Sequence, residues 1–189
     1  MKRYILYNVY LGAVLSAILC GCGAGRQEME DVFLVEALGV DWSEEAVVLT
    51  AADREKLLRA EGSTAQQSHR HLKEGGEGYV ALTHVEHIVA GAECDLRAVL
   101  EGALQGEEVG QTALLWMAEA GSARDLMEQV NGGVRRLEAI EKNARGLRPV
   151  SVMEGLTCLE ETGAVTLPML AVEKEELIWT GERIWTESR

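Results

Sequence analysis

Apolar residues fall in runs along this chain, and the spacing within each run predicts whether it forms a strand or a helix. The run at 32–40 predicts a buried strand, and the run at 46–50 predicts its antiparallel partner across a polar turn at 41–45. The β-forming residues of 79–90 predict a central strand, and 112–118 predicts a short apolar one. The fold is therefore expected to begin with a hairpin and to continue into a sheet.

The C-terminal part of the chain repeats the hairpin pattern. Two runs, 166–172 and 176–185, predict a closing pair of strands joined by a turn at Lys174-Glu175. Trp179 and Trp185 lie an even number of positions apart in the second run, so a regular strand would place both indoles on one face. Core or sheet packing is the simpler interpretation of this pair, and an exposed aromatic patch for a protein partner is the alternative.

Segments with apolar residues at helical spacing separate these strands. They predict helices over 65–73, over 93–104, after Ser122 and from Ser151 to about Glu161. Ser63 and Gln66 have the spacing of a capping box, whereas the charged segment 53–62 predicts a loop. Strands and helices alternate irregularly, which indicates an α+β fold with a mixed, largely antiparallel sheet and several helices packed on it.

The first 22 residues have the pattern of a bacterial secretory signal. Lys2 and Arg3 form a basic start, an apolar run covers 4–19, and Gly21 precedes Cys22. A Cys directly after such a small residue is typical of a lipobox, in which the Cys sulfur receives a diacylglycerol and the chain is cut before it. We therefore expect lipidation of Cys22, with acyl chains that hold the protein on the outer face of a membrane.

This interpretation divides the chain into three parts. Residues 1–21 are expected to be a lipoprotein signal peptide, 22–31 a lipidated tether, and 32–189 a folded domain. The glycines of the tether are better explained as a flexible spacer than as a phosphate loop, because no strand precedes them. An uncleaved membrane anchor is the alternative for the apolar run, which is shorter than the ~20 residues that a spanning helix needs.

Composition and charge restrict the classes of partner. Hydrophobic residues make up 47% of the 189 residues, which is enough for a core. Loss of Lys2 and Arg3 with the signal would change the net charge from −13 to −15. A chain this acidic is not expected to bind nucleic acid or an anionic membrane surface by charge attraction. Attachment to the bilayer is therefore expected to come from the lipid.

Two cysteines remain in the predicted domain, Cys94 and Cys158. Outside the cytoplasm they can form one disulfide. Two buried free thiols are an equally good interpretation, because Cys packs well as a small apolar residue.

The sequence contains no convincing enzymatic motif: G-x-S-x-G, Walker A and H-E-x-x-H are all missing. His69 and His71 lie two apart on a predicted helix, and His84 and His87 lie on a predicted strand facing opposite sides. Neither pair has the geometry of a metal clamp. We therefore expect no catalytic, metal or cofactor-binding residues. The weaker alternative is a lipid-anchored hydrolase that uses His84 or His87 with Glu86.

Short segments follow one another in an order that matches a known family. They are Cys22 with EMED at 28–31, LVEALGVD at 34–41, EGSTA at 61–65, HVEHIVAG at 84–91, SARDL at 122–126, LPML at 167–170 and GERIW at 181–185. As an ordered set with the lipobox, they make the chain resemble the Ger(x)C family, the lipoprotein C subunits of spore germinant receptors. The family's W-D after the lipidated Cys is Gly23-Ala24 here, and Thr83 replaces the Gly before the strand His.

The resemblance implies a function and partners. It suggests a lipid-anchored, non-enzymatic subunit on the outer face of the inner spore membrane that takes part in spore germination. The implied partners are the integral membrane A and B subunits of the receptor. The family's further C-terminal domain has no counterpart before Arg189, so 32–189 is expected to correspond to the family's N-terminal domain.

A second function of a different class fits the same anchor. The chain can instead be a stand-alone extracytoplasmic lipoprotein that binds a small molecule. A sizeable apolar pocket with convergent polar groups would favour this function, whereas an exposed hydrophobic surface without a pocket would favour the receptor subunit.

Overall fold

The computed structural model describes residues 32–42, 45–76, 78–105, 109–129 and 133–186. The chain divides into two units, Met1–Val32 and Phe33–Arg189, and nearly all of the described residues belong to the second. The predicted signal peptide and tether, including Cys22, lie outside the described residues.

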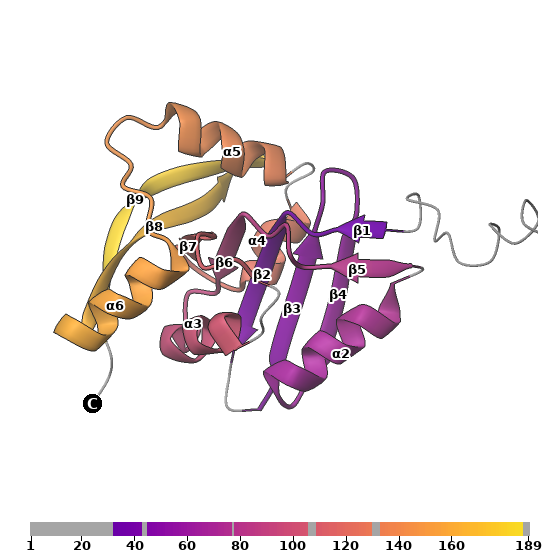
Figure 1. Ribbon diagram of the computed structural model, residues 1–189. Helices are drawn as coiled ribbons and strands as arrows, with labels where there is room; N and C mark the ends of the chain where they lie inside the picture. The colour runs from indigo at the N-terminus through magenta and orange to yellow at the C-terminus, as the bar shows by residue number, and fades with distance from the viewer. Residues whose placement is uncertain (1–31, 43–44, 77, 106–108, 130–132, 187–189) are drawn as a thin grey trace, which may run out of the picture. The chain divides into compact units, whose positions relative to one another are not determined.

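The second unit is built around a mixed sheet of seven strands (Figure 1). In spatial order these are β4 (Leu57–Gly62), β3 (Val47–Ala52), β2 (Ala37–Trp42), β6 (His87–Ala90), β7 (Leu114–Ala118), β8 (Ala164–Glu173) and β9 (Glu176–Thr186). The inner strands β2, β6, β7 and β8 run parallel, and antiparallel pairs flank them on both sides. The antiparallel pairs contain most of the paired residues, as the sequence predicted.

A second, two-stranded sheet pairs β1 (Val32–Leu34) with β5 (Tyr79–Ala81). The predicted central strand at 79–90 is therefore two strands in different sheets. A turn at 83–84 separates them, and only β6 reaches the centre of the large sheet. Val85 and Leu82 are buried in this connection, which explains why the whole stretch resembles one apolar strand in the sequence.

Helices cover both faces of the large sheet. One face carries α2 (Ala65–Gly75), α3 (Leu96–Gln105) and α6 (Val152–Thr162), whose buried residues join one core cluster with Leu38, Ile88 and Leu115. The other face carries α4 (Ala123–Gln129) and α5 (Gly133–Asn143), which join a second cluster with Val89 and Trp116. The α+β class is confirmed.

The central strands are buried on both faces because helices cover both. Ile88 faces the first cluster and its neighbour Val89 faces the second, and Leu115 and Trp116 alternate in the same way. Each of these side chains is at most 1% exposed. Such strands read as continuous apolar runs, which is typical of the parallel centre of a sheet.

Helix starts follow local capping chemistry. Ser151 and Glu154 form a full capping box at the start of α6, and Ser122 Oγ accepts a hydrogen bond from the Asp125 N–H at the start of α4. For α2 the cap is one residue later than predicted. Thr64 Oγ1 accepts from the Gln67 N–H, and the Gln67 side chain accepts from the Ser63 N–H and hydroxyl.

The predicted loop at 53–62 is wrong in its second half, which forms the edge strand β4. Ala60 is buried and Leu58 half-buried, while Arg59 and Glu61 are exposed and form an ion pair at 3.0 Å. Charged side chains on the outer face of an edge strand limit unwanted pairing with other chains. The charge that suggested a loop is therefore a property of the edge.

The predicted shared face of Trp179 and Trp185 is also wrong. The register between β8 and β9 shifts between Met169 and Leu170, so that Leu170 pairs with Trp179 and Met169 pairs with Gly181. This bulge reverses the alternation of the strand. Trp185 packs on the first core cluster, whereas Trp179 is opposite Leu170 of the second.

Candidate functional site

An apolar pocket of about 300 Å³ lies between α2 and α3, over strands β2, β3 and β6. The two helices cover the same face of the sheet, with β2 and β3 in view between them (Figure 1). Aliphatic side chains from the sheet and α3 form most of the wall. The lining residues are Leu38, Val40, Trp42, Val47, Leu49, Ala65, Gln66, His69, Leu82, Ile88, Ala98, Val99, Glu101, Gly102 and Val109.

One end of the pocket depends on the contact between Trp42 and Gly102. A Cβ at position 102 would lie 3.2 Å from Trp42 Cζ3, so glycine lets α3 approach the indole closely. The Trp42 backbone N–H donates to Cys94 Sγ at 3.2 Å, which ties the end of β2 to the segment before α3. These contacts place the Trp42 indole at the pocket wall.

Three polar side chains line the pocket among these apolar walls. Gln66 and His69 come from α2, and Glu101 comes from α3. Glu101 Oε1 lies 3.4 Å from Arg97 Nη1, one helical turn away. Lysine and arginine do not occur among the lining residues that the structure describes. An apolar cavity with a few polar groups, at the lower end of the ~300–1,000 Å³ range, is typical of a small-molecule site.

The carboxylate of Asp41 forms a second notable feature, at the end of β2. Its Oδ1 accepts from the Ala123 N–H at 2.7 Å and its Oδ2 accepts from the Arg124 N–H at 3.0 Å. Asp41 thereby occupies the first turn of α4, where backbone N–H groups lack partners within the helix. Burial raises the pKa of Asp41, and the hydrogen bonds from Arg124 and Ala123 oppose that rise.

Gly91 leaves space for this carboxylate. A Cβ at position 91 would overlap Asp41 Oδ1, so any larger residue would displace the cap of α4. Asp41, Gly91 and Ala123-Arg124 belong to three of the segments that carry the family resemblance. The structure brings these three segments together at one end of the parallel strands. Their contacts there cap α4 and pack it against the end of β2.

The four histidines are dispersed. His69 lines the pocket, and His71 Nδ1 lies 2.7 Å from the Glu61 carbonyl oxygen, to which it donates as the Nδ1–H tautomer. His84 lies in the turn before β6, so the predicted placement of His84 and His87 in one strand is wrong. The described residues contain no cluster of three or more potential metal ligands.

His87 is the buried histidine, with only 1% of its surface exposed. Its Nδ1 accepts from Trp116 Nε1–H at 3.2 Å, which assigns the ring proton to Nε2. Burial lowers the pKa of His87, against the opposing effect of Glu141 and Glu138. Glu86, the acid that the hydrolase hypothesis pairs with His84 or His87, is exposed to solvent.

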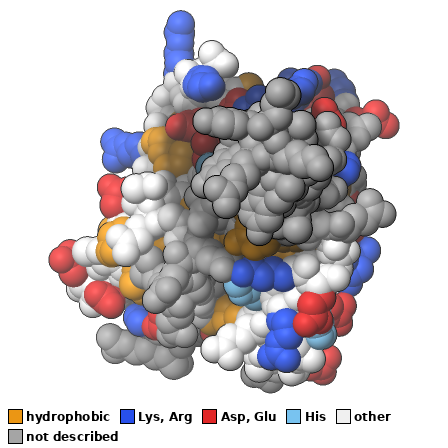
Figure 2. All heavy atoms as spheres, turned by 45° about the vertical axis from the view of Figure 1, so that its right-hand side comes forward, with side chains coloured by type: hydrophobic (Ala, Val, Ile, Leu, Met, Phe, Trp, Pro, Cys, Tyr) orange, Lys and Arg blue, Asp and Glu red, His pale blue; other side chains and the backbone are white. Residues whose placement is uncertain are grey.

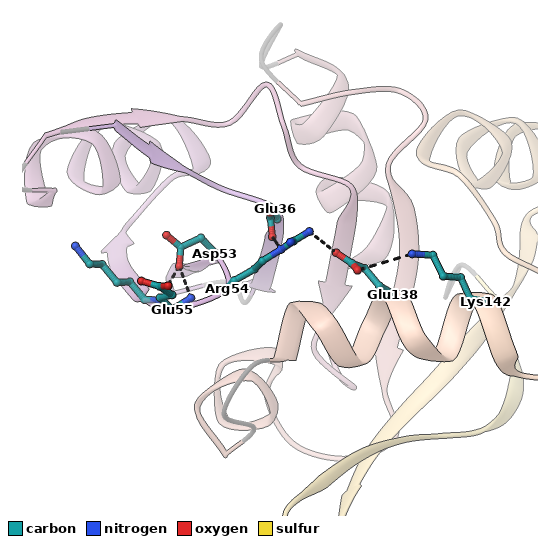
Figure 3. Close-up of polar contacts among 7 residues, drawn as sticks. Glu36, Asp53, Arg54, Glu55, Glu138 and Lys142 are labelled. Atoms are coloured by element: carbon teal, nitrogen blue, oxygen red, sulfur yellow. Dashed lines mark hydrogen bonds and ion pairs between the residues drawn. The ribbon is translucent and has the colours of Figure 1, made fainter. Parts of the chain in front are cut away.

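On the other face of the sheet, Arg54 connects distant parts of the chain. It lies between Glu36 and Glu138 at distances of 3.2 and 3.0 Å, and Lys142 approaches Glu138 from the far side (Figure 3). A cavity of about 110 Å³ lies beneath α4 and α5 beside this network. Because both carboxylates already share one guanidinium, the network is best explained as a contact that holds α5 on the sheet.

The cysteines of the domain differ in environment. Cys94 is buried in the first core cluster, and burial raises the pKa of its thiol to about 12. Cys158 is exposed on α6, and both are free in the structure. Cys94 is therefore an unreactive core residue.

Comparison with known proteins finds no matching family model, no matching curated protein and no matching solved structure. None of the helices in the described ranges is long and apolar enough to cross a membrane.

On the face shown in Figure 2, acidic and basic side chains are interspersed, and hydrophobic side chains of the described residues are visible between them.

No pattern in the sequence predicted the pocket. Its walls come from segments up to 71 positions apart, Leu38 to Val109, so no local motif marks it. The available signal was Gly102, a glycine inside an amphipathic helical segment, which often indicates close packing against another element.

Proposed function

We propose that this protein is a lipid-anchored, non-enzymatic subunit of a spore nutrient-germinant receptor that takes part in spore germination. In this proposal Cys22 carries the lipid and holds the domain on the outer face of the inner spore membrane. The partners are the integral membrane A and B subunits of the receptor.

The observation that supports the proposal most strongly is the junction around Asp41. Three segments that resemble the Ger(x)C family are far apart in the sequence, yet Asp41 bonds the start of α4 and excludes a side chain at Gly91. Because these residues contact one another, the packing of the domain requires all three segments together. Such a requirement explains why the segments occur as a set, whereas chance similarity of separate segments would not explain it.

The two buried residues His87 and Cys94 also suit a role without catalysis. His87 is buried with its Nδ1 bonded to Trp116, and the Cys94 thiol has a pKa raised to about 12. Neither group is prepared for nucleophilic or acid–base chemistry near pH 7. A domain of this kind is better suited to assembly and signalling beside membrane partners.

The anchor is tested by cell fractionation of two matched variants. Cys22→Ala removes the proposed lipidation site, so the protein is expected to leave the membrane fraction. Cys20→Ala changes the neighbouring cysteine and should leave the protein in the membrane fraction with a diacylglycerol mass on Cys22. Retention of the Cys22→Ala protein in membranes would contradict the lipoprotein assignment.

A stand-alone extracytoplasmic small-molecule binding lipoprotein is the second candidate function. The 300 Å³ apolar pocket with Gln66, His69 and Glu101 in its lining favours it. The two candidates differ in what they require. A stand-alone binding protein works without membrane partners. A receptor subunit needs them and should therefore be isolated together with them.

A further inference from the structure

We infer that the pocket between α2 and α3 binds a small molecule that has an apolar body and a neutral or cationic polar group. This inference rests on the second candidate function and adds the chemical class of the ligand. It is independent of Cys22 and of the proposed receptor partners.

The size of the pocket is the first argument. The pocket of about 300 Å³ is open to solvent beside the exposed Gln66 and Glu101, whereas Leu38, Val40 and Leu49 in its lining are each at most 8% exposed. Its volume lies at the lower end of the ~300–1,000 Å³ range of small-molecule sites. It is also too small for a folded peptide segment, so a small molecule is the occupant that fits.

The walls determine the body of the ligand. Val47, Leu82, Ile88 and Val99 present aliphatic surface, and the Trp42 indole adds an aromatic surface beside Gly102. Such walls offer water few hydrogen-bond partners, so apolar cavities exchange water readily for apolar ligands. An aliphatic or aromatic body therefore matches most of the lining.

The charges determine the polar group. Glu101 is the ionisable acid of the lining, and none of the described lining residues is a lysine or arginine. Its 3.4 Å separation from Arg97 exceeds the ~2.7–2.9 Å of a strong charge-assisted hydrogen bond, so Arg97 offsets the carboxylate only in part. An anionic ligand would meet this carboxylate, which Arg97 offsets only in part, whereas Gln66 and His69 add hydrogen-bonding side chains to the lining.

The test compares three probes of one size and three charges. We would titrate 1-naphthalenemethanol, 1-naphthylmethylamine and 1-naphthoate into the full-length protein in nanodiscs by calorimetry, with empty nanodiscs as the blank. The neutral and cationic probes are expected to bind, and the anionic probe is expected to bind about tenfold more weakly because of repulsion by Glu101. Equal affinity for all three, or tightest binding of the anion, would overturn the ligand class.

Matched variants locate the binding. Ala98→Phe fills the pocket and should abolish binding, while Ala120→Phe makes the same change at an exposed turn and should not. Gln66→Phe obstructs the pocket from an exposed position, so it keeps the test valid if Ala98→Phe does not fold. Glu101→Gln should reduce the tenfold difference between probes, and Glu160→Gln on α6 should not. Binding unchanged in both phenylalanine pocket variants would overturn the site.

Failure of the function and failure of the ligand class give different results. If no probe binds the wild-type protein at millimolar concentration, small-molecule binding by this pocket is contradicted as a whole. If the anion alone binds, the pocket is a site but its ligand is of the opposite charge class.

Discussion

At the scale of single residues, burial determines what the polar side chains of this protein do. His87 and Asp41 both lie where charge is disfavoured, yet each has hydrogen-bond partners that define its role. His87 accepts from Trp116, and Asp41 caps α4. Both residues contribute to stability through these contacts, and the contributions are measurable.

His87 predicts a specific pH dependence of stability. Its pKa is lowered by burial from the ordinary 6.5, so below that pH the unfolded chain binds a proton that the folded protein does not. The free energy of unfolding should therefore fall as the pH falls below 6.5, by at most about 1.4 kcal/mol per pH unit from this group. His87→Asn keeps an acceptor for Trp116 and should remove this component in urea unfolding between pH 8 and 5. A wild-type minus variant difference that is constant with pH would contradict this account.

Gly91 predicts a destabilising effect of one methyl group. Gly91→Ala places a Cβ onto Asp41 Oδ1 and should lower the free energy of unfolding by about 1–3 kcal/mol, as overpacking usually does. Gly75→Ala is the matched control, because a Cβ there has no neighbour within 4 Å. Urea unfolding of both variants provides the measurement. Equal stability of the two would show that the Asp41 junction tolerates a side chain.

At the scale of elements, local signals predicted most helices and strands, and non-local packing explains the errors. The hairpin of β2 and β3, the caps of α4 and α6 and the β8–β9 turn at Lys174-Glu175 follow from neighbouring residues. The bulge between Trp179 and Gly181 depends on how β9 pairs with β8, which no window of the sequence shows.

The candidate site was less predictable than the fold, for the same reason. The order β2-β6-β7-β8 at the sheet centre brings segments together that are distant in the chain. The pocket arises only when α2 and α3 pack over that sheet. A glycine at position 102 inside a helical segment is consistent with close packing of that helix against another element. Only the structure identifies Trp42 as the residue that α3 approaches there.

The start of α2 gives a test at this scale. Thr64→Ala removes the side chain that accepts from the Gln67 N–H and should cost about 1 kcal/mol of stability. Ser63→Ala loses only an exposed hydroxyl bond to Gln67 and should cost clearly less. Thermal or urea unfolding distinguishes the two variants. A larger loss for Ser63→Ala would place the cap at Ser63 instead, as the sequence spacing had predicted.

At the scale of the whole molecule, we propose that an acidic domain is attached to a membrane through a lipid on Cys22. The full chain has a net charge of −13, so electrostatic attraction is not expected to hold it on an anionic membrane surface. The lipid on Cys22 would concentrate the domain beside membrane proteins, where weak contacts suffice for assembly. The pocket can then contribute to signalling or serve an independent binding function.

The central claim is that this chain works as a subunit among membrane partners. The most direct measurement is chemical cross-linking in intact spores, followed by affinity isolation of the chain from detergent-solubilised membranes and identification of the attached proteins. The account predicts that two polytopic membrane proteins are recovered with the wild-type and Cys20→Ala chains and are lost with Cys22→Ala. Isolation of the wild-type, membrane-bound chain without any polytopic partner would contradict it.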